Sequence, residues 1–150
     1  MPRITARTKA RRRAVDILFE ADQRGMYSPL GLSDLLQERL ELTAAQTALP
    51  EYSADIVDGV ATHLDGIDSV LTQYIQGRPL ERLPAVDRAI LRMAVWEMFF
   101  NHEIDRTIAI SEATTIAADL STDGSPGLVN AVLDRVRNSE TAVAASLGVH

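Results

Sequence analysis

A stretch rich in large apolar residues predicts a helix over 84–100 that is buried on most sides. Between Met93 and Phe100 only Glu97 is charged, and the single Trp of the chain lies there. Apolar residues at steps of three and four mark one face, and others fill most of the circumference. Pro84 suits a first helical turn, where a missing N–H costs little. We predict that this helix is the centre of a helical domain. Three charged residues give its first half a polar side: Asp87, Arg88 and Arg92.

Helical spacing recurs along the rest of the chain, and no segment shows the strict alternation of a half-buried strand. Gly59 and Gly66 indicate a close helix contact or a bend in their helix, since each costs up to about 1 kcal/mol relative to Ala. The sequence therefore predicts an all-α fold of six or seven helices. The other helices are expected over 8–24, 29–42, 50–76, 107–120 and 125–137, with a polar connector over 43–49. We expect a flexible basic arm over 1–8, a helical domain over 9–137 and a weakly ordered tail over 138–150.

Charge is distributed unevenly along the chain. The first thirteen residues contain six cations and no acid, whereas the remainder carries nine Arg and 21 acids, a net charge of −12. Positive charge at the start of a helix opposes the helix dipole, so helix stability does not explain the cluster. A basic patch on an acidic body favours binding of nucleic-acid phosphates. The alternative is a basic helix end that is simply solvated. The cations are Arg3, Arg7, Lys9, Arg11, Arg12 and Arg13.

The sequence offers little for catalysis or metal binding. Without Cys there is no thiolate ligand, disulfide or thiol nucleophile. His63, His102 and His150 each lack a second His three or four residues away, the spacing of a metal-binding pair on a helix. No glycine-rich phosphate loop follows a strand. No apolar run is long enough to span a membrane, and the basic start lacks the apolar core of a signal peptide. We therefore expect a soluble cytoplasmic binding protein without cofactor, not an enzyme.

Three segments in order resemble the bacterial NusB family of transcription antitermination factors. Residues 9–19, KARRRAVDILF, are similar to that family's Arg-rich start running into a helix. Residues 83–92, LPAVDRAILR, are similar to its central helix. Residues 110–133, from ISEA through LSTD to SPGLVNAVL, resemble its last two helices and the turn between them. The similarity runs in register over about 9–137.

The resemblance implies two three-helix subdomains that share a core, and binding without catalysis. NusB-like proteins pair with NusE, a ribosomal small-subunit protein that is also a transcription factor. The pair recognises single-stranded boxA RNA in leader and ribosomal transcripts, and other Nus factors connect it to the elongation complex. Carried over by position, the RNA-binding residues are expected to be Arg7, Lys9, Arg11, Arg12, Arg13, Asp123, Ser125 and Leu128. The resemblance also implies that NusE is basic, and the residues that face it are expected to be Glu81, Asp87 and Arg88.

The turn at 120–128 departs from the family pattern of two acids, Ser and a later Phe. Gly124 replaces the second acid, and Leu128 replaces the aromatic residue. Because stacking of a base on an aromatic ring contributes roughly 1–3 kcal/mol, RNA contact through this turn is expected to be weaker or differently arranged.

Three alternatives stay open from the sequence. The first is a protein–protein adaptor whose basic arm meets an acidic partner, with little RNA binding of its own. The second is an enzyme, because NusB-like domains also occur fused to RNA methyltransferases, but 150 residues leave no room for a methyl-donor domain. The third is a homodimer, since the apolar stripes do not reveal which of them are buried between two copies.

Overall fold

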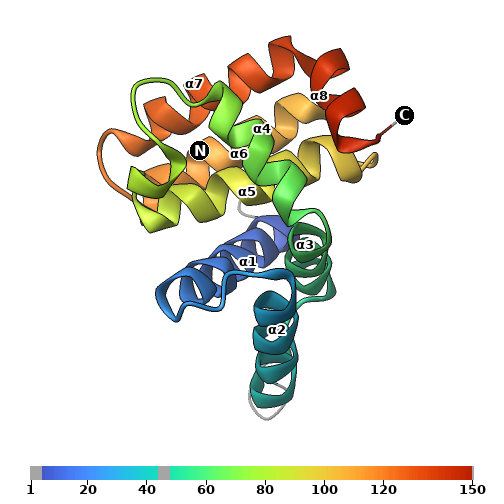
Figure 1. The fold of residues 1–150 in the computed structure, drawn as a ribbon. Coiled ribbons are helices and arrows are strands. Elements are labelled where there is room, and N and C mark those ends of the chain that lie inside the picture. Colours follow the sequence, from blue (N-terminus) through green and yellow to red (C-terminus); the bar gives the residue numbers. More distant parts are fainter. Residues whose placement is uncertain (1–4, 44–47, 150) are drawn as a thin grey trace.

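The computed structural model describes residues 5–43 and 48–149, and every regular element in them is helical (Figure 1). The all-α prediction is confirmed, but these residues form eight α-helices and one short 3₁₀ helix instead of six or seven helices. Arg3 of the basic cluster and much of the predicted connector lie outside the described residues. The helices are α1 (Ala6–Gln23), α2 (Pro29–Thr43), α3 (Glu51–Thr62), α4 (Leu64–Tyr74), η1 (Leu80–Arg82), α5 (Ala85–Phe100), α6 (Arg106–Leu120), α7 (Ser125–Asn138) and α8 (Glu140–Leu147).

The extra helices come from two breaks that the apolar pattern does not mark. The predicted helix over 50–76 is interrupted at His63, whose φ of −113° and ψ of 22° lie outside the helical range. Apolar residues continue in helical spacing across this break. After α7, Ser139 breaks the helix with similar angles, and α8 follows within the segment expected to be weakly ordered. Gly148 ends α8 with φ +73°, a left-handed conformation that glycine adopts readily.

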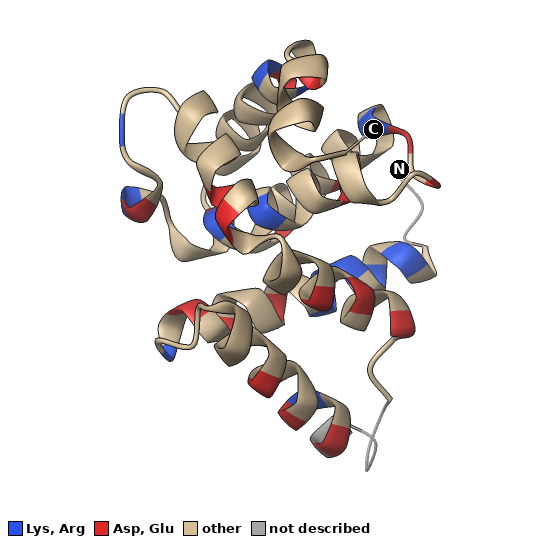
Figure 2. Cartoon of the chain, turned by 45° about the vertical axis from the view of Figure 1, so that its right-hand side comes forward, with Lys and Arg blue, Asp and Glu red and all other residues tan. Residues whose placement is uncertain are grey.

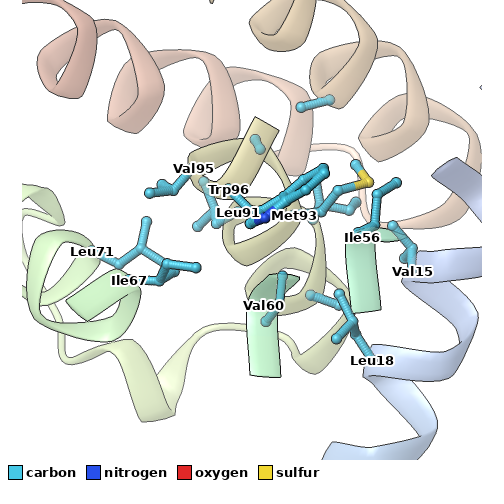
Figure 3. Packing of buried hydrophobic residues seen from close by; sticks show 14 of the residues in the cluster. Val15, Leu18, Ile56, Val60, Ile67, Leu71, Leu91, Met93, Val95 and Trp96 are labelled. Atoms are coloured by element: carbon cyan, nitrogen blue, oxygen red, sulfur yellow. The ribbon is translucent and has the colours of Figure 1, made fainter. Parts of the chain in front are cut away.

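The helices form two layers with α5 between them. In Figure 1, α1, α2 and α3 lie below, while α4, α6, α7 and α8 lie with α5 above. Helix α5 contacts α1 and α3 on one side, and α4, α6 and α7 on the other. All its residues from Ala89 to Phe99 are buried, so the predicted central helix is confirmed. Figure 3 shows its side chains meeting those of α1, α3 and α4.

The close helix contact that Gly59 indicated lies between α3 and α5. A Cβ atom on Gly59 would be 1.9 Å from Nε1 of Trp96, far inside contact distance. The indole is rigid and only 9% exposed, so it has little room to move aside. Glycine therefore lets the two backbones approach, at the expected cost in helix propensity.

A polar cluster joins the two layers at the first half of α5, where a solvated side was expected. Arg92 is only 6% exposed, and its Nε donates to Asp68 of α4 at 2.9 Å. Arg88 donates through Nε and one amino group to Asp22 of α1, both at 3.0 Å. The Arg92 guanidinium also lies 3.7 Å from the ring centre of Tyr27. The prediction of a solvated side is wrong, because Arg88 and Arg92 pair with acids of α1 and α4.

Candidate nucleic-acid interface

The first turns of α1 present two unpaired cations on one face. Thr5 caps the helix, because its hydroxyl accepts a hydrogen bond from the Thr8 amide at 3.0 Å. Lys9 is exposed and Arg13 is half-buried, and their four-residue spacing places them on the same face. In the described part of the chain, neither forms an ion pair. Figure 2 shows basic positions following one another at this end of α1. Both cations are available to phosphates.

Arg11 lies on the other side of α1 and is only 2% exposed. Its Nε donates to both carboxylate oxygens of Glu97, at 3.1 and 2.8 Å, and an amino group pairs with Glu112 at 3.0 Å. The Tyr52 hydroxyl also donates to Glu97. Burial, assisted by this hydrogen bond, raises the pKa of Tyr52 and keeps the hydroxyl protonated. The expectation that Arg11 faces RNA is corrected, because its guanidinium is enclosed by these partners.

Arg7 and Arg12 lie at the surface in ion pairs. Arg7 pairs with Glu103 at 3.0 Å, and Arg12 pairs with Asp119 near the end of α6. All four side chains are at least 30% exposed. Because exposed ion pairs contribute only about 0–1 kcal/mol, an RNA phosphate can replace either carboxylate at little cost.

The turn between α6 and α7 is held to the core by a buried carboxylate. Asp87, in the first turn of α5, is only 1% exposed and accepts hydrogen bonds from the hydroxyls of Ser121 and Ser125. The Ser125 hydroxyl, which donates to Asp87 at 2.9 Å, also accepts the Thr122 amide at 3.2 Å. Ser125 is itself only 1% exposed. Two expected roles are therefore corrected: Asp87 is not on a docking surface, and the Ser125 side chain positions the turn from beneath.

The remaining turn residues differ in exposure. Asp123 and Gly124 are exposed, whereas Leu128 is half-buried and packs against the core. The Arg12–Asp119 pair joins α1 to the last turn of α6, immediately before this loop. The structure thus brings the basic start of α1 and the exposed turn to neighbouring positions, although they are about a hundred residues apart in sequence.

Of the residues expected to face a partner protein at the start of α5, only the first in sequence is exposed. Glu81 is exposed on η1. Arg88 is held inward, since it pairs with Asp22 and donates to the backbone carbonyl oxygen of Glu81 at 3.0 Å. Of the three residues expected at this edge, Glu81 alone presents a charge to solvent.

Sequence reasoning missed the acids that pair with the arm: Glu97, Glu103, Glu112 and Asp119. A signal for Glu97 was present, because one acid in an otherwise apolar helix needs a buried cation as a partner. For Asp119, an exposed acid on an amphipathic helix, no such signal existed.

Two further features are absent from residues 5–43 and 48–149, a metal site and a membrane-spanning helix. No group of three or more His, Asp or Glu residues there is arranged to hold a metal ion. None of the helices in this part of the chain is long and apolar enough to cross a membrane.

Comparison with known proteins shows which family the chain belongs to. Residues 8–138 match the model of the NusB family. The transcription antitermination protein NusB of Beutenbergia cavernae is 46% identical over 137 residues, covering 89% of this chain and 90% of the relative. NusB of T. maritima superposes with a TM-score of 0.71 at 27% identity, over 89% of this chain and 92% of that one. A crystal structure of the antitermination factors NusB and NusE in complex with double-stranded RNA superposes with a TM-score of 0.73 at 25% identity. The match covers 89% of this chain and 96% of that chain. With its helical fold and the match over most of its length, the chain belongs to the NusB family.

Proposed function

We propose that this protein is an RNA-binding transcription antitermination factor that acts as a heterodimer with NusE. The observation that carries the proposal is the pair of unpaired cations Lys9 and Arg13 on α1, the helix whose Arg12 pairs with Asp119 shortly before the exposed residues 122–124. Relatives are named as antitermination proteins, and one structural neighbour is a complex with NusE and double-stranded RNA. Both facts support the proposal. The protein is proposed to act by binding, in the cytoplasm, without a catalytic step.

Phosphate contacts supply the affinity in this account. Lys9 and Arg13 bind phosphates directly, and Arg7 and Arg12 exchange their surface carboxylates for phosphates. Such contacts position an RNA without reading its sequence. Sequence choice then depends on unstacked bases near the exposed backbone of the turn and on groups that NusE supplies. The proposed ligand is single-stranded boxA-type RNA in ribosomal and other leader transcripts, in support of ribosomal RNA synthesis or maturation.

NusE is proposed to dock at the edge that begins at Glu81. NusE is described by the family resemblance as basic, and Glu81 is an exposed carboxylate with no ion pair in the described residues. Contacts to other Nus factors would connect the heterodimer to the elongation complex.

The test measures RNA affinity by fluorescence anisotropy, with a labelled boxA RNA and a scrambled control, in the presence and absence of NusE. We expect weak binding alone and tighter, boxA-selective binding by the heterodimer. Equal affinities with and without NusE would contradict the heterodimer. A Glu81→Lys variant should lose the gain from NusE while keeping the weak binding of the protein alone.

A protein–protein adaptor is the second candidate function. It is favoured by the burial of Arg11 and Ser125 and by the lack of an aromatic side chain at Leu128, which together shrink the surface for RNA. Retained NusE binding without detectable RNA binding in the same assay would select this alternative.

A further inference from the structure

We propose that a groove between α3 and α5 binds an arginine- or lysine-bearing segment of a partner protein. The groove encloses about 400 Å³ and is lined by residues of α1, α3 and α5 and of the loop after α5. Its aromatic residues are Tyr52, Trp96 and Phe100, and its acids are Asp55, Asp58 and Glu103. The groove adjoins the proposed RNA surface at Arg7, which belongs to both, but the inference does not rest on RNA binding.

The floor of the groove contains a hydrogen-bond donor without a partner. Trp96 is only 9% exposed, and among the described residues its Nε1–H makes no hydrogen bond. The nitrogen itself keeps contact with solvent, since it is not one of the fully buried polar atoms without a partner. This nitrogen faces Gly59 in the groove wall, because a Cβ atom on that residue would be 1.9 Å away from it. An indole N–H is a donor only, so it can take up an acceptor that reaches the groove. A backbone carbonyl oxygen of a bound segment would replace water at this position.

The walls carry unpaired negative charge. Asp55 and Asp58 are exposed, three residues apart on one face of α3, and neither forms an ion pair within the described chain. The third acid, Glu103, is already paired with Arg7. In Figure 2, acidic positions follow one another along α3 next to the basic start of α1. Two unpaired carboxylates beside aromatic rings attract an organic cation and repel RNA phosphates.

Arg7 of the chain itself shows how such a cation is held. Its guanidinium lies 4.7 Å from the ring centre of Tyr52 and 3.0 Å from the Glu103 carboxylate. One end of the groove thus already contains an arginine on a ring beside an acid. The groove is also lined by Trp96, by Phe100, whose ring stacks on His63 at 3.9 Å, and by the unpaired Asp55 and Asp58. No cation of the described chain pairs with these two acids. The occupant that fits is a basic peptide segment.

The only Trp of the chain lies in the groove, so its fluorescence reports binding directly. The probe is acetyl-Gly-Arg-Gly-Arg-Gly-amide, compared with the same peptide carrying citrulline, which keeps the shape but removes the charge. We expect a saturable change in Trp96 emission with the arginine peptide and none with the citrulline peptide. Neutralising both acids, in Asp55→Asn/Asp58→Asn, should weaken binding about tenfold. The control Asp34→Asn/Asp65→Asn removes the same charge from exposed positions outside the groove and should bind normally.

Amide chemical-shift mapping accompanies the titration and should place the changes on α3 and α5, with circular dichroism confirming that each variant is folded. Three results would overturn the proposal. One is the absence of both a fluorescence change and shifts in these helices. Another is equal binding of the arginine and citrulline peptides, or equal loss in the two double variants. The third is a change in Trp96 fluorescence that is larger with a single-stranded RNA than with the arginine peptide. That result would assign the groove to nucleic acid.

Discussion

Replacing Arg11 with Ala should destabilise the fold, even though Arg11 belongs by sequence to a run of RNA-binding cations. In the structure its guanidinium is 2% exposed and holds Glu97 through two hydrogen bonds and Glu112 through an ion pair. Removing one partner of a buried ion pair typically costs about 3–5 kcal/mol, because the other charge stays buried without compensation. Domains of this kind are stable by about 5–15 kcal/mol, so Arg11→Ala should remain folded but weakened.

Urea unfolding followed by circular dichroism measures this loss. With a slope of about 1–3 kcal/mol per molar urea, the midpoint should fall by roughly 1–5 M. The matched control is Arg13→Ala, two residues further along α1, where the side chain is half-buried without an ion pair. That substitution should change stability by less than about 0.5 kcal/mol. An unchanged midpoint in Arg11→Ala, or an equal loss in Arg13→Ala, would refute the assignment of Arg11 to the core.

The remaining predictions concern packing, the turn and acid stability. Gly59→Ala should lose about 1–3 kcal/mol in urea unfolding through its clash with the α5 indole, whereas Gly127→Ala, with no atom within 4 Å, should not. Asp87→Ala should cost about 1–3 kcal/mol by leaving two hydroxyls unsatisfied, and should speed hydrogen exchange at 121–125; unchanged exchange would contradict its anchoring role. The hydrogen bond from Arg39 lowers the pKa of Glu20 in the folded protein. The stability that ionised Glu20 contributes is therefore full above its unfolded-state pKa near 4.5, and it is lost as pH falls through the lower pKa of the folded state. Glu20→Gln should therefore flatten the acid limb of a plot of stability against pH.

The sequence predicted the central helix well because burial on all sides leaves an unmistakable composition. It did not predict the break at His63, since the apolar stripe is continuous from α3 into α4 while the two helices pack on different neighbours. Helix α8 was missed because only Val143 of its residues is buried, so it carries almost no periodic signal.

The sequence predicted which basic residues lie at the start of α1, but not which of them face the core and which face solvent. Arg11 precedes Ala14 by three residues and Leu18 by seven, so helical spacing alone puts it on the buried face of α1. Lys9 and Arg13 fall outside that stripe. The acid that compensates Arg11 is 86 residues away, and no local pattern predicts such a pairing.

This orientation divides α1 between two tasks. One side carries Arg11 into the core and Arg7 into the groove beside α3, and the other side keeps Lys9 and Arg13 in solvent. Residues two apart lie on nearly opposite sides of a helix, which is why adjacent cations in one short run have different environments.

The most direct test of the account is the salt dependence of boxA RNA binding by the protein and by Lys9→Ala/Arg13→Ala. If these two residues each contact a phosphate, the slope of log K against log salt should become shallower by about 1.4 on single-stranded RNA. RNA affinity should fall, while the urea midpoint stays that of the unsubstituted protein. Unchanged affinity and slope in the folded double variant would contradict the claim that this face of α1 binds RNA.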